Sequence, residues 1–170
     1  SSDLADTDRD AVAAVRAARR GGDRRAEAEA HWVLAVHRDR RGLPQESLSA
    51  FDAALASLEA AEAEPAAHGP GEEVVRSMRA LRVEVLLSKA GLLRGAGMLA
   101  DAVAAAVRAY GIAAAQQHRR LLGAIYEDLG ASCLAQGGYA DALRFLRASL
   151  ARSEEHTSEL QSPCNLVFRL

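Results

Sequence analysis

The sequence has few aromatic residues, few prolines and a single lysine. Of its 170 residues only 4% are aromatic, one is Trp and four are Pro. With 49% apolar residues and no sustained alternation of apolar and polar positions, this composition argues against a β-sandwich and favours helices rich in Ala, Leu and Val. Every basic residue except Lys89 and the histidines is Arg, a bias typical of a GC-rich genome that does not by itself indicate a binding site.

Long apolar runs and a surplus of charge are also missing, and the chain has only two cysteines, Cys133 and Cys164. The 21 basic and 23 acidic residues give a net charge of −2, so there is no basic surplus for nucleic acid. No run of 18 apolar residues and no signal-peptide pattern occurs, and we therefore expect a cytoplasmic protein without membrane contact. Cys133 occupies an apolar position of the pattern described below, and we interpret it as a small core residue in a reducing compartment.

Motifs for catalysis or metal binding are not found either. None of the five histidines has a Cys or carboxylate partner at metal-ligand spacing. His31 and His37 are six residues apart, which places their rings on different faces of a helix. The sequence has no GxSxG, P-loop or GxGxxG motif. We therefore expect no enzyme activity, cofactor or metal in this chain.

A spaced pattern of large and small residues occurs three times. The full pattern has a large residue, a Leu–small pair, a glycine turn, and a second small–large pair; the third copy departs from it, with Lys89 at the Leu position, and keeps only the small residues. The copies run Tyr126, Leu129, Gly130, Cys133, Gly137, Ala142 and Leu146; His31, Leu34, Ala35, Arg38, Gly42, Ser47 and Phe51; and Leu86, Lys89, Ala90, Leu93, Gly97, Ala102 and Ala106. We expect the small residues at helix crossings, with Leu34, Phe51, Leu129 and Leu146 between units.

The turn glycines set the length of the repeated unit. The step from Gly97 to Gly137 gives a unit of roughly 40 residues, a length found among helical repeats. The longer step from Gly42 to Gly97 fits the same unit with one insertion. The insertion falls in a loop at about 63–71, where Pro and Gly interrupt the apolar rhythm.

This pattern resembles the tetratricopeptide repeat, a helix–turn–helix unit that stacks into extended arrays. The resemblance implies an all-α fold, an α-solenoid of about three helix pairs preceded by one N-terminal helix. The expected helices are 8–20, then the pairs 24–41 and 44–62, 72–94 and 99–116, and 119–136 and 139–151. The alternative is an ordinary Ala-rich amphipathic bundle.

The last nineteen residues differ in composition from the rest. Residues 152–170 contain no Ala or Gly and hold the only Asn of the chain. Arg152 to Ser162 resembles the in-frame translation of a widely used sequencing-adapter oligonucleotide. We therefore interpret 152–170 as a non-native, adapter-derived tail and 1–151 as a repeat fragment that we expect to be cut at both ends. The alternative is an acidic peptide or metal motif around Glu154, Glu155 and His156.

The resemblance also implies a binding surface, because the first helix of each pair lines a concave groove in this family. The residues expected there are Glu29, Trp32, Val36 and Asp39, then Leu87, Ser88, Gly91 and Arg94, and then Glu127, Asp128 and Ala131. Trp32 is a candidate binding hot spot, although a Trp packed beneath the preceding helix fits the sequence equally well. Family members that clamp a peptide carboxylate carry Lys and Asn where this chain has Trp32 and Val36, so that subclass is not expected.

The functional expectation is a scaffold or sensor module that binds a protein or peptide and belongs to a larger bacterial regulatory or signalling protein. The turn Gly22-Asp23-Arg24-Arg25 resembles those of large bacterial transcriptional activators and repeat-bearing signalling enzymes. A covalently linked downstream effector domain is one partner that this interpretation admits. The alternatives are the regulatory repeat region of an enzyme, such as a nucleotide cyclase or kinase, whose catalytic domain is missing, and a purely structural oligomerisation bundle.

Overall fold

Seven α-helices and no strand make up the part of the chain that the computed structural model describes, residues 2–63 and 71–161. Side chains are described for residues 8–63 and 71–152. The helices are α1 Ser2–Gly21, α2 Arg24–Arg40, α3 Pro44–Glu62, α4 Glu72–Gly95, α5 Leu99–Ala115, α6 Arg119–Ala135 and α7 Tyr139–Gln161. The predicted all-α class is confirmed.

Five of the predicted helices, α2 to α6, have boundaries within one residue of those in the structure. The first helix starts earlier than predicted, at Ser2, and the last continues beyond position 151, to Gln161. That extension has a simple cause, because 152–162 contains no Gly or Pro and several good helix formers. Most of the predicted insertion loop, 64–70, lies outside the described residues, as do residues 162–170 of the predicted tail.

One turn geometry joins five of the helix pairs that follow each other in the chain. Two positions before each new helix stands a residue with positive φ; these are Gly22, Gly42, Gly97, Gln117 and Gly137. The next residue donates its amide to the carbonyl five positions back, for example Asp23 N to Ala18 O at 3.1 Å. This is the Schellman arrangement, which satisfies the free carbonyls at a helix end. Each copy of the sequence pattern contains one such turn, at Gly42, Gly97 or Gly137, so each copy is a helix–turn–helix segment.

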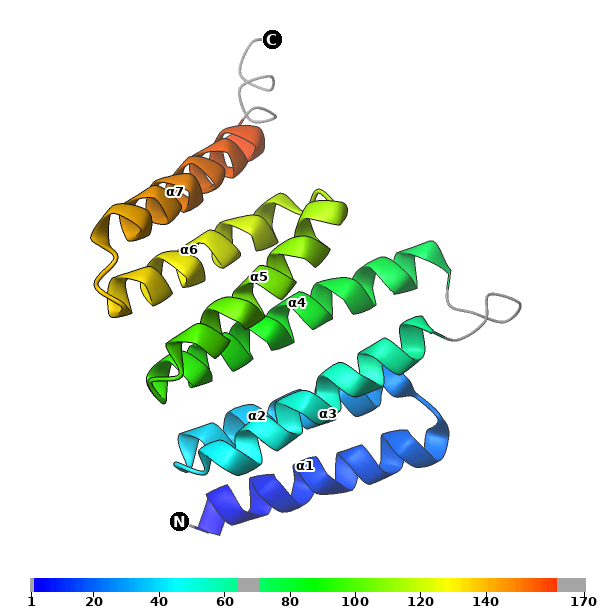
Figure 1. Ribbon diagram of the computed structural model, residues 1–170. Coiled ribbons are helices and arrows are strands. Elements are labelled where there is room, and N and C mark those ends of the chain that lie inside the picture. The colour runs from blue at the N-terminus through cyan, green and yellow to red at the C-terminus, as the bar shows by residue number, and fades with distance from the viewer. Residues whose placement is uncertain (1, 64–70, 162–170) are drawn as a thin grey trace.

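The helices follow one another in chain order from α1 at one end of the molecule to α7 at the other (Figure 1). Each helix packs against its neighbours in the chain, most extensively in α2–α3, α6–α7 and α4–α5. The helices that come first in each pair, α2, α4 and α6, also touch one another: α2 contacts α4, and α4 contacts α6. Among the described residues no helices further apart are in contact, so α1 does not meet α7.

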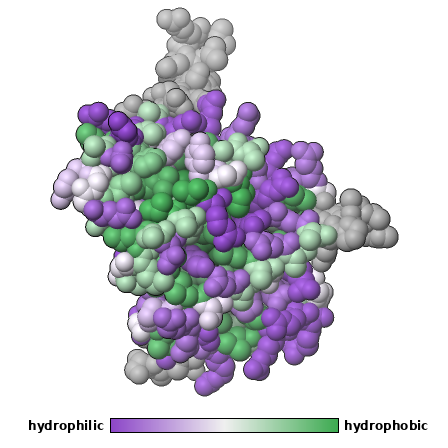
Figure 2. All heavy atoms as spheres, viewed as in Figure 1, coloured by the Kyte–Doolittle hydropathy of each residue, from purple (hydrophilic) through white to green (hydrophobic). Residues whose placement is uncertain are grey.

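A core of Ala, Leu and Val runs through these contacts. The predicted crossing residues Ala35, Ala90 and Ala142 are buried, and so is Gly130. Of the large residues expected between units, Leu34, Phe51 and Leu129 are buried. Leu146 differs, since it lies against Gly130 on one side and is partly open to solvent on the other. In Figure 2 hydrophobic residues gather mainly over the α5–α6 part of the visible face, whereas hydrophilic residues dominate over α1–α3.

Candidate binding face on the first helices

Equivalent positions on α2, α4 and α6 form what we call the first-helix face. They are related by the same two offsets that separate the turn glycines Gly42, Gly97 and Gly137. Its residues are Glu29, Trp32, Val33, Val36 and Asp39 on α2, Leu87, Ser88, Gly91 and Arg94 on α4, and Glu127, Asp128, Ala131 and Leu134 on α6. The helical period brings the residues of each set to one side of their helix.

Trp32 lies at the join between α2 and α4. It is partly buried and packs against the hydrophobic core. Its indole Nε1 donates a hydrogen bond of 3.1 Å to Ser88 Oγ, and that hydroxyl donates in turn to Glu84 O at 2.9 Å. Trp32 therefore lies between the two positions that the sequence left open, partly packed on the core and partly exposed.

A pocket of about 280 Å³ opens beside Trp32 on the same helix. It is lined by Trp32, Val33, Val36, His37 and Arg40. Its wall is mainly apolar, and Val33 is exposed although sequence reasoning did not select it. An apolar wall with a few polar groups at its edge is the usual form of a site that accepts a ligand side chain.

Arg94 and Asp128, both predicted to face a ligand, are paired with each other. Arg94 Nη1 donates to Asp128 Oδ1 and lies 3.4 Å from Ser132 Oγ, so the pair joins α4 to α6. Both side chains are mostly shielded from solvent, and the pair is consequently screened less by salt than an exposed one. Their charges hold the two first helices together and are not free on the surface.

The other predicted residues divide into an apolar middle and an acidic edge. Glu29, Asp39 and Glu127 are exposed, and Glu29 forms an ion pair of 2.9 Å with Arg25. Leu87 is partly buried against the core, and Gly91 and Ala131 are partly buried. Sequence reasoning also missed Leu134, an exposed residue of α6. Aligning the three copies by their turn glycines would have identified this residue, because Leu134 occupies the position equivalent to Asp39 and Arg94.

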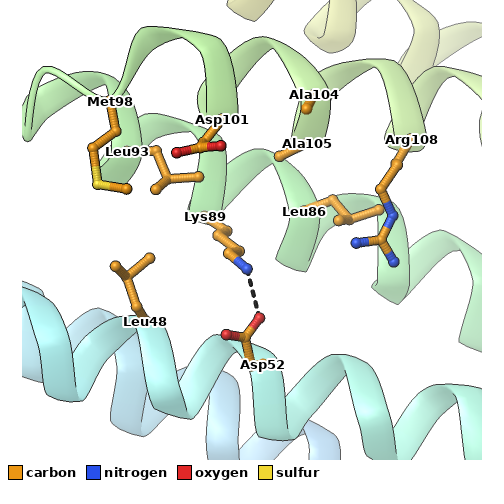
Figure 3. Close-up of a pocket in the computed structure, with 10 residues that line it drawn as sticks. All are labelled: Leu48, Asp52, Leu86, Lys89, Leu93, Met98, Asp101, Ala104, Ala105 and Arg108. Carbon is orange, nitrogen blue, oxygen red and sulfur yellow. Dashed lines mark hydrogen bonds and ion pairs between the residues drawn. The ribbon is translucent and has the colours of Figure 1, made fainter.

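The opposite side of α4 faces a second pocket, of about 300 Å³, between α3, α4 and α5 (Figure 3). Lys89 Nζ crosses it to pair with Asp52 on α3. Lys89 stands where the repeat pattern expects Leu, and the carboxylate of Asp52 compensates its charge.

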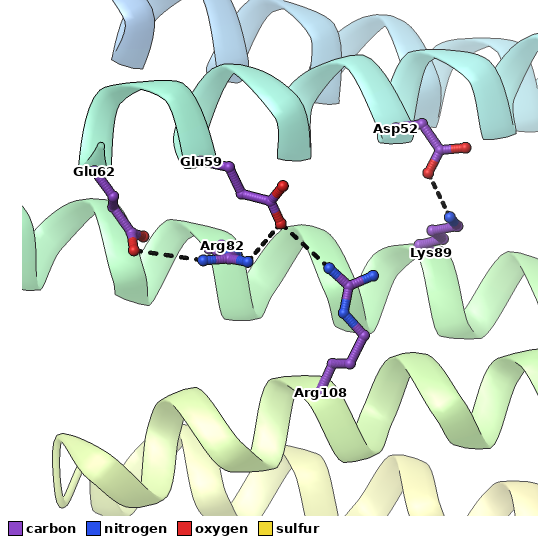
Figure 4. Close-up of polar contacts among 6 residues, drawn as sticks. All are labelled: Asp52, Glu59, Glu62, Arg82, Lys89 and Arg108. Carbon is purple, nitrogen blue, oxygen red and sulfur yellow. Dashed lines mark hydrogen bonds and ion pairs between the residues drawn. The ribbon is translucent and has the colours of Figure 1, made fainter. Parts of the chain in front are cut away.

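A second set of ion pairs lies near this pocket. Glu59 of α3 accepts hydrogen bonds from Arg82 of α4 and Arg108 of α5 (Figure 4). Ion pairs thus join the first helix pair to the second, each with a small contribution because its acidic partner, Asp52 or Glu59, is 62% or 47% exposed.

The most deeply buried charge is Glu27, at the contact of α1 with α2. Its two carboxylate oxygens accept from Arg19 at 2.8 Å and Arg24 at 3.1 Å. Burial by itself raises the pKa of Glu27, but the hydrogen bonds and charges of the two arginines outweigh it, so the pKa is lowered. One turn on, burial lowers the pKa of His31, and both of its ring nitrogens are buried without a hydrogen-bond partner in the described part of the chain.

The described residues do not combine into a metal centre or a reactive thiol. No group of three or more His, Cys, Asp or Glu side chains among them has the geometry to hold a metal ion. Cys133 is partly buried, and burial together with the charge of Asp141 raises the pKa of its thiol, away from the reactive thiolate. This surrounding suits the packing role expected of Cys133.

Comparison with known proteins gives no family for the chain. A scan against models of protein families and a search of curated proteins each found no match. Within residues 2–63 and 71–161, none of the helices has the length and apolar character needed to cross a membrane. The interpretation of this chain therefore rests on its structure, in which the helices have equivalent positions at constant offsets and share one turn geometry.

Proposed function

We propose that this chain is a peptide-binding scaffold built as a tetratricopeptide-like α-solenoid. Support comes from the turn geometry that five of the helix connections share, all except the one between α3 and α4, and from the contacts of α2 with α4 and of α4 with α6. Repeats that touch only their neighbours form extended arrays, which commonly bind a partner along one side.

The observation that carries the proposal is the exposed apolar surface beside an acidic edge on the first-helix face. Trp32, Val33 and Val36 line a pocket large enough for one apolar side chain. Asp39 and Glu127 are exposed carboxylates of the same face, whereas Glu29 is paired with Arg25 and Arg40 lines the pocket itself. A peptide with a large apolar anchor and Lys or Arg on either side complements this chemistry.

The proposal makes this chain the scaffold or sensor part of a larger bacterial regulatory protein in the cytoplasm. An enzyme such as a nucleotide cyclase or kinase, joined to the repeats, is compatible with it. The competing proposal is a structural bundle whose surfaces serve only to assemble copies of the chain.

Peptide display against the immobilised protein tests the proposal, with two matched variants as the measure. Val33 and Val107 are 53% and 54% exposed, but only Val33 lies on the first-helix face. Peptides selected on the unaltered protein should lose at least about tenfold in affinity for Val33→Glu and keep their affinity for Val107→Glu, because a charge in the pocket is desolvated by the anchor. Equal binding to the two variants, or no enriched peptide, would refute the proposal.

A further inference from the structure

One side of α7 exposes a row of large apolar residues, which we call the α7 stripe. It consists of Tyr139, Leu143, Leu146 and Leu150, all exposed. Their spacing of four, three and four positions places them on one side of the helix. Of the other described helices, α7 contacts only α6.

The equivalent side of the earlier second helices is buried in the first pair and partly buried in the second, where Ala106 is buried and Tyr110 is 40% exposed. In the first helix pair, the positions equivalent to Leu146 and Leu150 hold Phe51 and Leu55, which are 1% and 4% exposed, against 39% and 59% for the two leucines. Helix α4 contacts α3, where Lys89 pairs with Asp52 next to Phe51, and helix α6 contacts α5. In the latter case the ring of Tyr110, equivalent to Leu150, meets the ring of Tyr126 at a centroid distance of 6.0 Å. The stripe therefore has the chemistry of a helix–helix interface.

Charge distinguishes the helix that would fit α7 from the one that fits α3. Asp52 of α3 pairs with Lys89 of α4. At the position equivalent to Asp52, helix α7 carries Arg147, which is exposed and has no ion pair to a described residue. If a helix packs on the stripe in the way that α4 packs on α3, its residue at the position of Lys89 faces Arg147. That residue should therefore be an Asp or Glu.

We propose that the α7 stripe is a docking site for an amphipathic helix that carries an acidic residue beside its apolar side. The inference rests on the repeated register and on Arg147, and it does not depend on the peptide-binding role of the first-helix face. A second copy of this chain is a poorer occupant, because pairing two α7 helices brings the Arg147 side chains of both copies to the same interface.

The test uses labelled synthetic peptides of the α4 sequence, residues 72–95, titrated into the full chain by fluorescence anisotropy. One peptide carries Lys89→Glu and its matched control keeps Lys89. The Glu peptide should bind about fivefold more tightly, the size of an exposed ion pair. Arg147→Glu in the protein should reverse this preference, and Leu150→Ser should weaken both peptides at least tenfold. Val33→Glu should leave the affinity of both peptides unchanged, because Val33 lies on the first-helix face and not on the α7 stripe.

Three results would overturn the inference. The first is equal affinity of the two peptides, and the second is a preference that Arg147→Glu leaves unchanged. The third concerns the occupant: a dimer in sedimentation that Leu150→Ser converts to a monomer would assign the stripe to a second copy. Circular dichroism of the variants, expected to match the unaltered protein because both positions are exposed, rules out loss of the fold as the cause.

Discussion

At Gly130 the backbone of α6 comes so close to α7 that there is no room for a side chain. A Cβ atom built there would lie 2.8 Å from Leu146 Cγ and 3.3 Å from the carbonyl oxygen of Ala142. Leu146 could turn aside, but the backbone carbonyl cannot move without shifting α7. The close crossing of the last helix pair therefore depends on glycine at this position.

We predict that Gly130→Leu lowers the free energy of unfolding by about 1–3 kcal/mol, the usual cost of overpacking. Urea denaturation would measure it. Gly111→Leu is the matched control, because nothing lies within 4 Å of a Cβ at Gly111 in α5. That change should be neutral or add up to about 1 kcal/mol through helix propensity. Equal effects at Gly130 and Gly111 would show that the assigned crossing is wrong.

His31 places an imidazole at a position where the repeat pattern expects a large apolar residue. Both ring nitrogens are buried without a partner in the described structure, and leaving such groups unsatisfied costs about 1–3 kcal/mol each. Burial lowers the pKa of His31, so the unfolded chain takes up a proton at a higher pH than the folded one. The stabilising contribution is complete above the ordinary His pKa of about 6.5 and is lost as pH falls toward the lowered pKa.

His31→Leu should therefore raise stability at pH 7 by about 1 kcal/mol and should flatten the fall in stability between about pH 7 and pH 5. Thermal unfolding at several pH values measures both effects. Below about pH 4.5 a further loss should remain in the variant, since the lowered pKa of Glu27 makes its contribution disappear in acid. An unchanged slope between pH 7 and 5 would show that His31 is not the group responsible.

At the scale of the element, the repeated turn explains why the helices begin where they do. Gly22, Gly42, Gly97 and Gly137 supply the positive φ that the turn requires, and glycine adopts it without steric cost. The fifth turn has Gln117 there with φ of 52°. For a residue with a Cβ this conformation costs about 1–2 kcal/mol, so the turn between α5 and α6 is strained.

Gln117→Gly should stabilise the protein by about 1 kcal/mol, because it removes this strain. Gln136→Gly is the control: Gln136 precedes the turn glycine of the last pair and has φ of −84°, where glycine has no advantage. That variant should be neutral or slightly less stable. The shift of the urea midpoint reports both changes, and a lower midpoint for Gln117→Gly would contradict the assigned backbone geometry.

Element boundaries could be predicted because the turns are marked in the sequence by glycine and by Pro44, which suits a helix start. Which side chains pair between helices could not be predicted from the sequence. Lys89 with Asp52 and Arg94 with Asp128 are 37 and 34 residues apart, and no local pattern indicates which charges will meet. For the same reason the sequence presented Arg94 and Asp128 as surface groups. Leu134 and the α7 stripe, by contrast, follow from the register once all positions are compared.

For the molecule as a whole, the contact pattern makes α4 the centre and leaves two open ends. Helix α4 touches α2, α3, α5 and α6, whereas α1 touches only α2 among the described helices, and α7 only α6. Regions with few contacts open locally before the rest of a protein unfolds. Hydrogen exchange followed by mass spectrometry should accordingly find the slowest amides in α4 and progressively faster ones toward α1 and α7. Uniform protection along the chain would point to a single closed bundle.

The central proposal is that the first-helix face receives a peptide, and Trp32 offers the most direct test because it is the only Trp of the chain. Its fluorescence should be followed while a display-selected peptide is added. The ring is partly exposed beside the pocket, so an apolar anchor that covers it should shift the emission to shorter wavelength and saturate with the peptide. We predict this shift in the unaltered protein and in Val107→Glu, and its loss in Val33→Glu. Saturable binding that leaves the emission of Trp32 unchanged would place the peptide elsewhere and contradict the proposal.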